Sequence, residues 1–509
     1  MLRKISGGWS LVSGLVSWAV LCVVLAATAV AGDDAAKIRD GIDRYLQSAG
    51  NAVFYLSYEL EVAAAGDGYE TSIHGLTVRY PGSADQTSIG DVSFRVTPLD
   101  DGNYRFTQVR IPEEIRFASP EQAGEDVVLH LNLERFEGVY SPETGTTIEY
   151  DILAKDVSLE ASFASAKTGM FQSTGIAIGT FSHNLQSRPQ SEKAMEQVSN
   201  LGFTDISVSH GGETLFRIGS SSLQLDWLLS DYAASVARSN KFFAELMAIE
   251  KFDEQSFIQL LRYSVVTPEE FSYLRGDMTF EEISWSRPET LFTLDQLKWT
   301  MDADDLDKPV GTNSQVISAR GFALSAPQDP VKDATFSLFP RRWTLPVKLV
   351  NLPRAAIIQE YVRLFRQSNS LSDLVAGMGP SGDLDARLTQ HMMDAGTVLV
   401  LDGQSIESEI VSATMDGALK FDSSSPLQIT GSVSAEVVGL MQLFEQAQTL
   451  QDREAAEEVM QGTMLLLSTG ETESGMQVPS VTKYLIEMTP EGAVVLNGTQ
   501  LSPPPAPEL

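Results

Sequence analysis

The chain contains five histidines, the side chains most often used for metal binding and for proton transfer near neutral pH. No two of them are three or four residues apart, so a single helical turn cannot present two of them to one metal ion. No His-Glu-x-x-His segment occurs either. We therefore expect isolated histidines and predict neither a metal site nor a cofactor. The five are His74, His130, His183, His210 and His391.

Two glycine-containing segments resemble parts of catalytic motifs. His210-Gly211-Gly212 is similar to the oxyanion loop of some esterases, but the third glycine is missing and no Gly-x-Ser-x-Gly elbow exists. A two-residue hairpin turn explains these residues more simply. Gly379-Pro380-Ser381-Gly382 also predicts a turn, because no Gly-Lys-Ser/Thr follows that could hold a phosphate. We predict no catalytic residues.

The densest acidic cluster consists of Asp302, Asp304, Asp305 and Asp307. Calcium uses such oxygen ligands. In an EF-type loop, however, position five would be Leu306, and no glycine occupies position six. We therefore expect a solvated loop here.

The most distinctive local charge is a basic stretch from residue 341 to residue 366, where six basic residues stand against Glu360 alone. One interpretation is a contact point for an anionic head group or an acidic partner. The other is pairing with nearby acidic surface. The candidate contact residues are Arg341, Arg342, Trp343, Lys348 and Arg354. The stretch also contains Arg363 and Arg366.

The amino-terminal residues follow the three-part plan of a secretory signal. Arg3-Lys4 precedes an apolar run from Leu11 to Ala27, and Ala29-Val30-Ala31 offers a small-x-small cleavage site. We expect cleavage after Ala31 and export to the periplasm. The alternative is an uncleaved membrane anchor, since the run is near the minimum length of a membrane span.

The composition excludes several classes of function. Cys22 is the only cysteine, so a cleaved chain would have no disulfide, thiolate zinc site or cysteine nucleophile. The formal net charge is −32, and such a chain is repelled by nucleic acid and by anionic membrane surfaces. Membrane contact is expected only through an uncleaved signal or through lipid handling.

Period-two alternation broken by turns dominates the chain and predicts antiparallel strands with one buried face. It occurs at 76–80, 92–96 and 129–133, and again in a closing hairpin in which Tyr484, Ile486 and Met488 are expected to point inward. Further strand-like segments are expected at Met278–Trp285, Phe292–Met301 and Gln315–Leu324. Helical periodicity predicts further elements at 35–49, 225–263, 353–367 and 434–467.

These patterns define an α+β fold, with long twisted antiparallel β-sheets and helices covering one face. We expect the following organisation. Residues 1–31 form the signal peptide, 32–224 an amino-terminal β-rich region, 225–265 a helical insertion, 266–502 a carboxy-terminal α+β region, and 503–509 a disordered proline-rich tail.

The closing hairpin also carries a family resemblance. The block Asp416-Gly417-Ala418-Leu419, a helical segment, and the hairpin from Tyr484 to Gly498 together resemble an alphaproteobacterial periplasmic family of unknown function. That family is loosely similar to AsmA-like envelope proteins. The resemblance implies an extended β-structure and a link to envelope lipid homeostasis, and it supplies no catalytic residues.

Three functions are therefore considered. The first is a non-enzymatic envelope protein that binds lipid or another amphiphile between sheet and helices. The second is a structural or assembly factor that binds another envelope protein through sheet edges. The third is a hydrolase without a recognisable motif.

Overall fold

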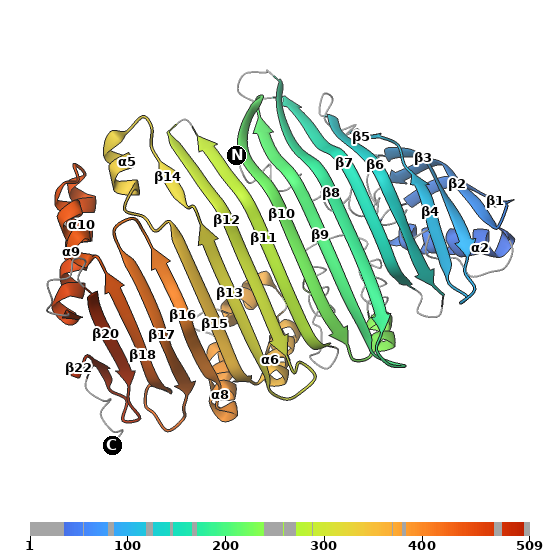
Figure 1. Cartoon of the computed structure of the whole chain (residues 1–509). Helices are drawn as coiled ribbons and strands as arrows, with labels where there is room; N and C mark the ends of the chain where they lie inside the picture. Colours follow the sequence, from blue (N-terminus) through green and yellow to red (C-terminus); the bar gives the residue numbers. More distant parts are fainter. Residues whose placement is uncertain are drawn as a thin grey trace. The chain divides into compact units, whose positions relative to one another are not determined.

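The computed structural model describes most of the chain after the amino-terminal segment (Figure 1). The described residues are 35–53, 55–79, 86–118, 126–142, 146–164, 171–238, 258, 271–287, 289–368, 370–378, 383–472 and 481–502. The expected signal peptide at 1–31, the turn at 379–382 and the tail at 503–509 lie outside them, as does most of the expected helical insertion.

The chain divides into two compact units. Unit 1 comprises Met1–Glu213 with Asp231–Ser264, and unit 2 comprises Thr214–Ser230 with Val265–Leu509. Both are built mainly from antiparallel strands, so the expected α+β class with long antiparallel sheets is confirmed.

The described part of unit 1 contains helix α2, helical residues at 232–238, and an antiparallel sheet whose strands pair largely in sequence order. β3 pairs with both β4 and β5, and these two short strands also pair with β6. The elements are α2 (Ala35–Val53), β1 (Tyr55–Ala65), β2 (Gly68–Arg79), β3 (Gln86–Pro98), β4 (Tyr104–Arg110), β5 (Glu114–Ala118), β6 (Asp126–Ser141), β7 (Thr146–Ala164), β8 (Phe171–Pro189) and β9 (Met195–His210).

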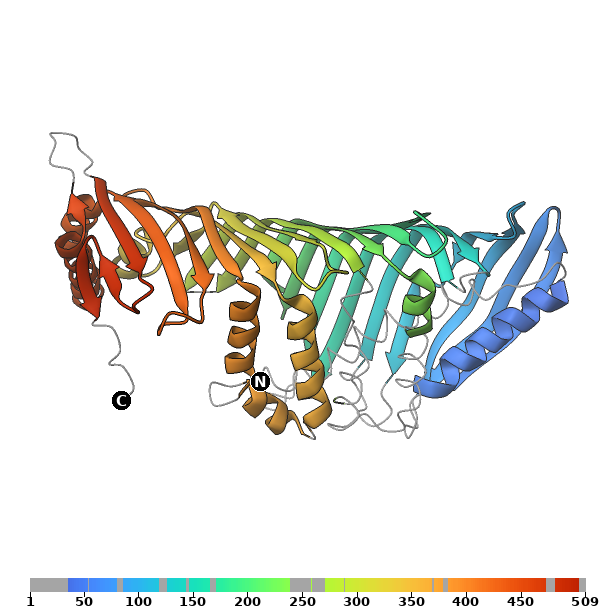
Figure 2. The same cartoon turned by 90° about the horizontal axis from the view of Figure 1, so that it is seen from below.

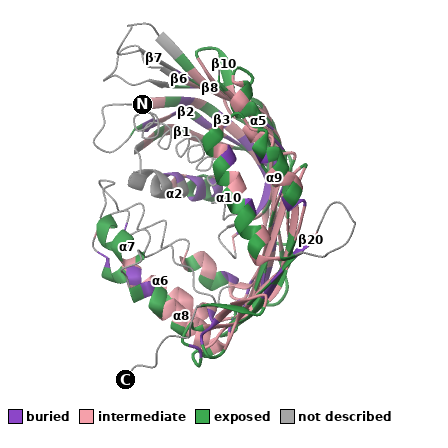
Figure 3. Cartoon of the chain, turned by 90° about the vertical axis from the view of Figure 1, so that its left-hand side faces the viewer, coloured by how far each residue is buried: buried purple, intermediate pink, exposed green. Residues whose placement is uncertain are grey.

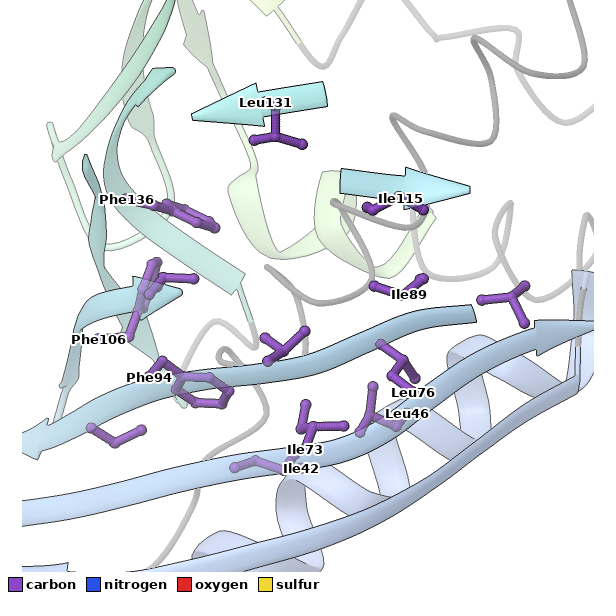
Figure 4. Close-up of a cluster of buried hydrophobic side chains, with 14 of the residues drawn as sticks. Ile42, Leu46, Ile73, Leu76, Ile89, Phe94, Phe106, Ile115, Leu131 and Phe136 are labelled. Carbon is purple, nitrogen blue, oxygen red and sulfur yellow. The ribbon is translucent and has the colours of Figure 1, made fainter. Parts of the chain in front are cut away.

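Helix α2 forms because its apolar residues recur every four positions and therefore share one face. Ile38, Ile42 and Leu46 are fully buried. They pack against side chains such as Ile73 on β2 in a core that continues through Phe94 and Phe136 (Figure 4). The sequence predicted this helix and its buried face correctly. It placed the end at Gly50, whereas the helix runs to Val53.

The sheet of unit 1 has one face that carries this core, which we call the apolar face of unit 1. On β7 this face changes phase, because Ala154 and Val157 both contact the core although they are three residues apart. Between them Asp156 has a positive φ of 49°, which interrupts the strict alternation of an extended strand. Asp205 on β9 has the same feature, with a φ of 51°. Gly179 lies between these two positions on β8 and makes room for the Asp205 side chain.

Unit 2 is a second antiparallel sheet, again paired mostly in sequence order. β13 and β14 both pair with β12, and the final strands pair as β18, β20, β21 and β22. The strands are β10 (Glu213–Leu229), β11 (Phe271–Arg287), β12 (Thr290–Asp304), β13 (Gly311–Arg320), β14 (Ala323–Ser325), β15 (Arg342–Leu352), β16 (Val398–Glu407), β17 (Ser412–Phe421), β18 (Ile429–Val438), β19 (Glu471–Thr472), β20 (Val481–Met488), β21 (Val494–Leu496) and β22 (Thr499–Ser502).

The helices of unit 2 lie in three connections between strands. α5 (Pro330–Phe336) precedes β15, and α6 (Arg354–Gln367), α7 (Leu371–Met378) and α8 (Asp383–Ala395) lie between β15 and β16. α9 (Leu440–Gln448) and α10 (Arg453–Thr469) follow β18. Figure 2 shows α6 and α8 side by side, projecting away from the plane of the sheet, and the pair α9–α10 beside the last strands.

Several predicted helix boundaries were wrong. Trp227 and Leu228 were expected in a helix, but they lie in β10 and pair with Leu274 and Tyr273 of β11. The described helical residues follow at 232–238. Val437 likewise belongs to β18 and not to a helix. In each case two consecutive apolar residues in a strand break the period-two pattern, so that the short segment resembles a helix.

The turns and the closing hairpin were predicted more accurately. Gly211 and Gly212 both have positive φ between β9 and β10, which confirms the two-residue turn. The closing hairpin is confirmed by the pairing of Met488 with Val494. Tyr484 is buried, whereas Ile486, on the same side of β20, is 36% exposed, so this side of the hairpin is only partly covered.

Candidate functional site

The basic stretch does not form a free cationic surface at its start. The Arg341 Nη1 atom lies 2.9 Å from Glu409 Oε1, and the Arg342 Nη1 atom lies 3.7 Å from Glu407 Oε2. All four side chains are exposed, so each pair contributes little to stability. The geometry therefore matches the alternative of pairing with acidic neighbours.

The other candidate residues of this stretch are separated by the strand itself. Trp343 points to the face opposite that of Arg342 and Lys348, because side chains alternate along β15. Arg354 lies beyond the far end of β15, in the first turn of α6. Burial lowers the pKa of Arg354, and its Nη1 atom has no hydrogen-bond partner among the described residues. The five candidates are therefore not brought together in one site.

The acidic cluster and the histidines also have local partners; His74 lies 3.5 Å from Asp91, and His391 lies 3.3 Å from Glu360. Asp302 and Asp304 lie in β12 and not in a loop, and they flank Arg275 at 3.5 Å and 3.3 Å. Lys308 forms an ion pair with Asp305. Across the described part of the chain, no three His, Cys, Asp or Glu side chains gather as metal ligands would.

The feature that the structure does bring together is an apolar face on the sheet of unit 2. Strand register places apolar side chains in rows across neighbouring strands. One row joins Leu223, Met278, Trp299, Ile317 and Leu345, from β10 to β15. A parallel row runs through Phe280, Leu297, Ala319, Trp343 and Ile406. Another runs through Trp227, Leu274, Ala303, Asn313, Leu349, Leu399 and Leu419, with Asn313 as its polar member. We call this the apolar face of unit 2.

Exposure distinguishes this face from the core of unit 1. In unit 1, side chains on the apolar face, such as Ile73 and Phe94, are at most 3% exposed. On the apolar face of unit 2, Ile317 is 41% exposed, Val347 36% and Ile406 44%. Figure 3 shows the difference between the buried residues of α2 and the mainly intermediate strands of unit 2. Large β-branched side chains therefore remain in contact with solvent at the centre of this sheet.

The ion pairs of β11 and β12 lie on the opposite face of the same strands, which we call the polar face of unit 2. Arg287, at the end of β11, lies instead over the Trp285 ring, 4.5 Å from its centroid. Lys298 Nζ lies 2.6 Å from Asp277 Oδ2, and Arg275 lies between Asp302 and Asp304. These residues alternate with the apolar rows, so each strand of the pair β11–β12 has one apolar and one charged side. An uncharged, partly exposed face suits an apolar ligand better than an ion.

Aromatic residues close one end of the apolar face. The Phe322 ring lies 5.5 Å from the Phe292 ring and 5.8 Å from the Trp343 ring, measured between centroids. Phe339, which follows α5, lies 6.4 Å from Phe322 and is exposed. Aromatic rings at these separations provide a rigid apolar surface.

A hollow of about 800 Å³ lies elsewhere, on the polar side of β17, β18 and β20. Asp416, Glu436 and Glu487 line it, and its lysine, Lys483, lies 3.6 Å from Glu436. Carboxylates at this density would oppose both an apolar chain and an anionic head group. We therefore assign the candidate site to the apolar face and not to this hollow.

No family model matches the chain, and neither a curated protein nor a solved structure is significantly similar to it. The resemblance to AsmA-like envelope proteins therefore stays a prediction. Among the described helices, none combines the length and the apolar composition that crossing a bilayer requires.

Sequence reasoning identified the strands of this face but not the face itself. Phe292–Met301 and Gln315–Leu324 were expected to be strand-like, and β12, β13 and β14 confirm this. The strand signal says which residues share a side, but it does not say whether anything covers that side. The sequence did contain one indication of an uncovered face. It predicts more strands with an apolar side than its few amphipathic helices could cover.

Proposed function

We propose that the protein binds a lipid or a similar amphiphile, with the hydrocarbon chain lying on the apolar face of unit 2. The observation that supports this most strongly is the exposure of Ile317 and Ile406, each of which lies in an apolar row; the exposed Val347 is on the same face and pairs with Gln315. Transfer of hydrocarbon from water onto such a surface contributes about 0.8 kcal/mol for each buried methylene. About ten methylenes would therefore offset the cost of ordering the chain.

The direction of the rows favours an extended ligand. Each row crosses several strands, and neighbouring strands are about 4.8 Å apart. A row from β10 to β15 therefore spans about 19 Å, which is comparable with an extended acyl chain. A partly exposed apolar face also fits a flexible chain better than a compact, strongly polar molecule.

Export to the envelope is part of the same proposal. The amino-terminal pattern of Arg3-Lys4, apolar run and Ala29-Val30-Ala31 favours delivery to the periplasm, where amphiphiles between two membranes need a protein surface to leave the bilayer. The acidic charge of the chain suits solubility in that compartment.

The first experiment is native mass spectrometry of the protein purified from its own envelope, followed by organic extraction. We expect a bound phospholipid or fatty acid. A fluorescent fatty acid then reports occupancy in solution. An empty protein that takes up no fluorescent fatty acid would contradict the proposal.

A matched pair of variants localises the binding. Ile317→Glu places a charge on the apolar face, and Val316→Glu places the same charge on the polar face of the same strand. We expect Ile317→Glu to weaken fatty-acid binding at least tenfold and Val316→Glu to leave it within twofold, because one buried charge opposes apolar contact strongly. Equal effects of the two variants would argue against this face.

The second candidate is a structural or assembly factor that binds another envelope protein through a sheet edge. Strand β1 is the first strand of unit 1 and has β2 as its paired neighbour. Recovery of a stoichiometric protein partner together with an empty apolar face would favour this candidate.

A further inference from the structure

Arg354, in the first turn of α6, has no counter-charge among the described residues. Its guanidinium forms no ion pair with any of them, and its Nη1 atom is buried without a hydrogen-bond partner. Burial lowers the pKa of Arg354, and no neighbouring carboxylate offsets this effect. The chain has 68 acidic and 36 basic residues, so a partly buried arginine that lacks a carboxylate partner needs an explanation.

Two acidic residues have their main chain beside Arg354, but their side chains pair with other cations. An ideal Cβ atom at Gly311 would stand 3.3 Å from Arg354 Cδ, 2.7 Å from the Asp304 carbonyl oxygen and 3.1 Å from that of Asp305. The Asp304 side chain nevertheless pairs with Arg275, and that of Asp305 pairs with Lys308. The structure therefore directs the nearby carboxylates away from Arg354.

The Arg354 side chain lies on the apolar face of unit 2. Gly311 begins β13, and alternation places it on the same face as Asn313 and Ile317. Because the Arg354 Cδ atom lies over the position that a Cβ at Gly311 would take, the arginine occupies this face at the end of β13. Figure 1 shows the start of α6 beside the ends of β13 and β15. Asn313 is the next residue along this face, about 7 Å from Gly311.

A chain of hydrogen bonds on the same face ends beside Arg354. Trp299 Nε1 donates to Gln315 Oε1 at 3.4 Å, and Gln315 Nε2 donates to Asn313 Oδ1 at 3.4 Å. An indole nitrogen can only donate, which fixes the orientation of both amides. The Asn313 Nδ2 group is therefore left as a donor, and it donates to no described residue. Neutral and charged donors thus meet at one end of the apolar face.

The sheet itself does not require polarity at this place. Asn313 is paired with Ala303 on one side and Leu349 on the other, and Gln315 is paired with Met301 and Val347. An apolar residue at position 313 would complete the row that runs from β10 to β17. The face is therefore apolar over most of its area and rich in donors at one end, which is the distribution that an amphiphile presents.

The start of α6 adds to the positive potential at this end. No side chain caps the helix after Pro353, and its first turn contains no acidic residue. A cation in the first turn is unfavourable, because the helix dipole already places partial positive charge there. Arg354 is therefore poorly placed for the stability of α6, and an anion bound beside it would offset both positive charges.

We infer that Arg354, together with Asn313 and Gln315, recognises the anionic head group of an amphiphile whose hydrocarbon chain lies on the apolar face of unit 2. The head group is a carboxylate or a phosphate, since a guanidinium binds the oxygens of either through paired N–H groups. The Asn313 amide supplies a further donor. This inference rests on the proposed function, and it adds the charge class of the ligand.

The test compares amphiphiles of equal chain length that differ in their head group. Palmitate, palmitoyl lysophosphatidate and hexadecanol are titrated at pH 7.5 against the full-length protein carrying 1-N-phenylnaphthylamine, an uncharged fluorescent probe of apolar surfaces. We expect the two anionic ligands to displace the probe at concentrations at least about tenfold lower than hexadecanol does, as a charge-assisted hydrogen bond implies. This ratio is the preference for an anionic head group.

Matched variants assign the preference to Arg354. Arg354→Gln should bring the preference close to one. Arg366→Gln removes the same charge from the same helix, but from an exposed side chain, and should keep the preference. Equal losses in the two variants would mean that the net charge of the protein sets the preference, and this result would overturn the inference.

Two further variants separate the head group from the hydrocarbon chain. Asn313→Leu completes the apolar row, so hexadecanol should bind at least as tightly as it does to the wild-type protein while the preference falls. This variant also keeps the inference testable if Arg354→Gln fails to fold. Ile317→Ser should weaken the binding of all three ligands by a similar factor and leave the preference unchanged.

Urea denaturation of the ligand-free protein distinguishes recognition from a structural role. Removal of an unpaired, partly buried cation from the start of a helix should leave the free energy of unfolding of Arg354→Gln unchanged or raise it. A structural arginine would give a less stable variant. Lower stability together with an unchanged preference would overturn the inference.

The remaining outcomes are also distinguishable. Equal affinity of the wild-type protein for hexadecanol and the anionic ligands, or a preference that survives both Arg354→Gln and Asn313→Leu, overturns the inference and leaves the proposed function intact. If calorimetry showed that inorganic phosphate binds as tightly as lysophosphatidate, the site would serve a free anion and not a head group. A wild-type protein that takes up neither the probe nor any of the three amphiphiles contradicts the proposed function as well.

Discussion

Glu282 on β11 lies opposite Gly219 on β10, so close that a Cβ atom at residue 219 would stand 2.9 Å from the Cβ atom of Glu282. Glu282 has a positive φ of 54°. On the next pair of strands, Gly321 has a φ of 72° and lies against Asp295. The same combination of a glycine and an acidic residue occurs in unit 1, where Gly179 faces Asp205. At each of these places the regular alternation of side chains between the two faces of the sheet is interrupted.

This arrangement predicts that Gly219→Ala is destabilising. The added methyl group would require β10 and β11 to separate, which should lower the free energy of unfolding by about 1–3 kcal/mol. Urea denaturation followed by circular dichroism measures the change. Gly462→Ala is the control, because nothing lies within 4 Å of that helical position. It should stabilise the protein by up to about 1 kcal/mol. Equal effects of the two substitutions would refute the steric argument.

The phase changes also explain part of what the sequence could not predict. Strict alternation would place Val157 on the face opposite to Ala154, and the structure places both on the core side because Asp156 interrupts the strand. Nothing in the residue type of an aspartate within a strand announces a positive φ. By contrast, α2 was predictable, because Ile38 and Ile42 repeat with the helical period and their face is fully buried.

The candidate site was less predictable than the fold, for a related reason. Arg342 and Trp343 are neighbours in sequence, but strand alternation places them on opposite faces of β15, and Arg342 pairs with Glu407. Charge density along the chain therefore did not translate into charge density in space. His183 looked isolated because its partners, Tyr150 and Ser199, are 33 and 16 residues away. Only strand register brings them together.

A hydrogen bond between Tyr58 and Asp43 should contribute to the docking of α2 on the sheet. The Tyr58 hydroxyl on β1 donates to Asp43 Oδ1 at 2.8 Å, and burial together with the carboxylate raises the pKa of Tyr58. We predict that Tyr58→Phe lowers the free energy of unfolding by about 1 kcal/mol, as expected for one partly buried hydrogen bond. Chemical denaturation provides the measurement.

The matched control for Tyr58 is Tyr361→Phe in α6. This substitution also removes a tyrosine hydroxyl group, but the hydroxyl of Tyr361 forms no hydrogen bond with any described residue. We expect a change smaller than about 0.5 kcal/mol. If Tyr58→Phe were equally neutral, the hydroxyl would not contribute to the position of α2.

His183 should give the protein a component of pH dependence with a definite sign. Burial lowers its pKa in the folded state, so between that pKa and about 6.5 the unfolded chain binds more protons. The contribution of His183 to stability is therefore complete above pH 6.5, and it is lost as the pH falls towards the folded-state pKa. The slope is at most about 1.4 kcal/mol per pH unit.

The measurement is the difference in unfolding free energy between the wild-type protein and His183→Phe from pH 5 to pH 7.5. We expect the wild-type protein to lose more stability on acidification than this variant. Ser199→Ala keeps the buried histidine and should keep the wild-type slope. A difference curve that is flat, or that has the opposite slope, would mean that His183 remains as accessible to protons as in the unfolded chain.

The last prediction concerns the helices between β15 and β16, which are joined by one carboxylate. Glu360 on α6 has a side chain that is only 13% exposed, and it lies 2.8 Å from Arg387 and 3.3 Å from His391, both on α8. Arg363, one turn further along α6, lies 2.7 Å away. Glu360→Gln would leave Arg363 and Arg387 facing one another without this counter-charge. We predict a loss of about 1–3 kcal/mol, because breaking a largely buried pair costs more than an exposed one.

Asp383→Asn is the matched control, because Asp383 also pairs with Arg387, at 3.4 Å, but its side chain is 89% exposed. Solvent screens such a pair, so we expect a change close to zero. Amide hydrogen exchange shows where the effect lies. In the Glu360→Gln variant, the exchange rate should rise in both α6 and α8, while the rate in α2 should not change. If the two substitutions accelerated exchange equally, the burial of Glu360 would not be what holds α6 and α8 together.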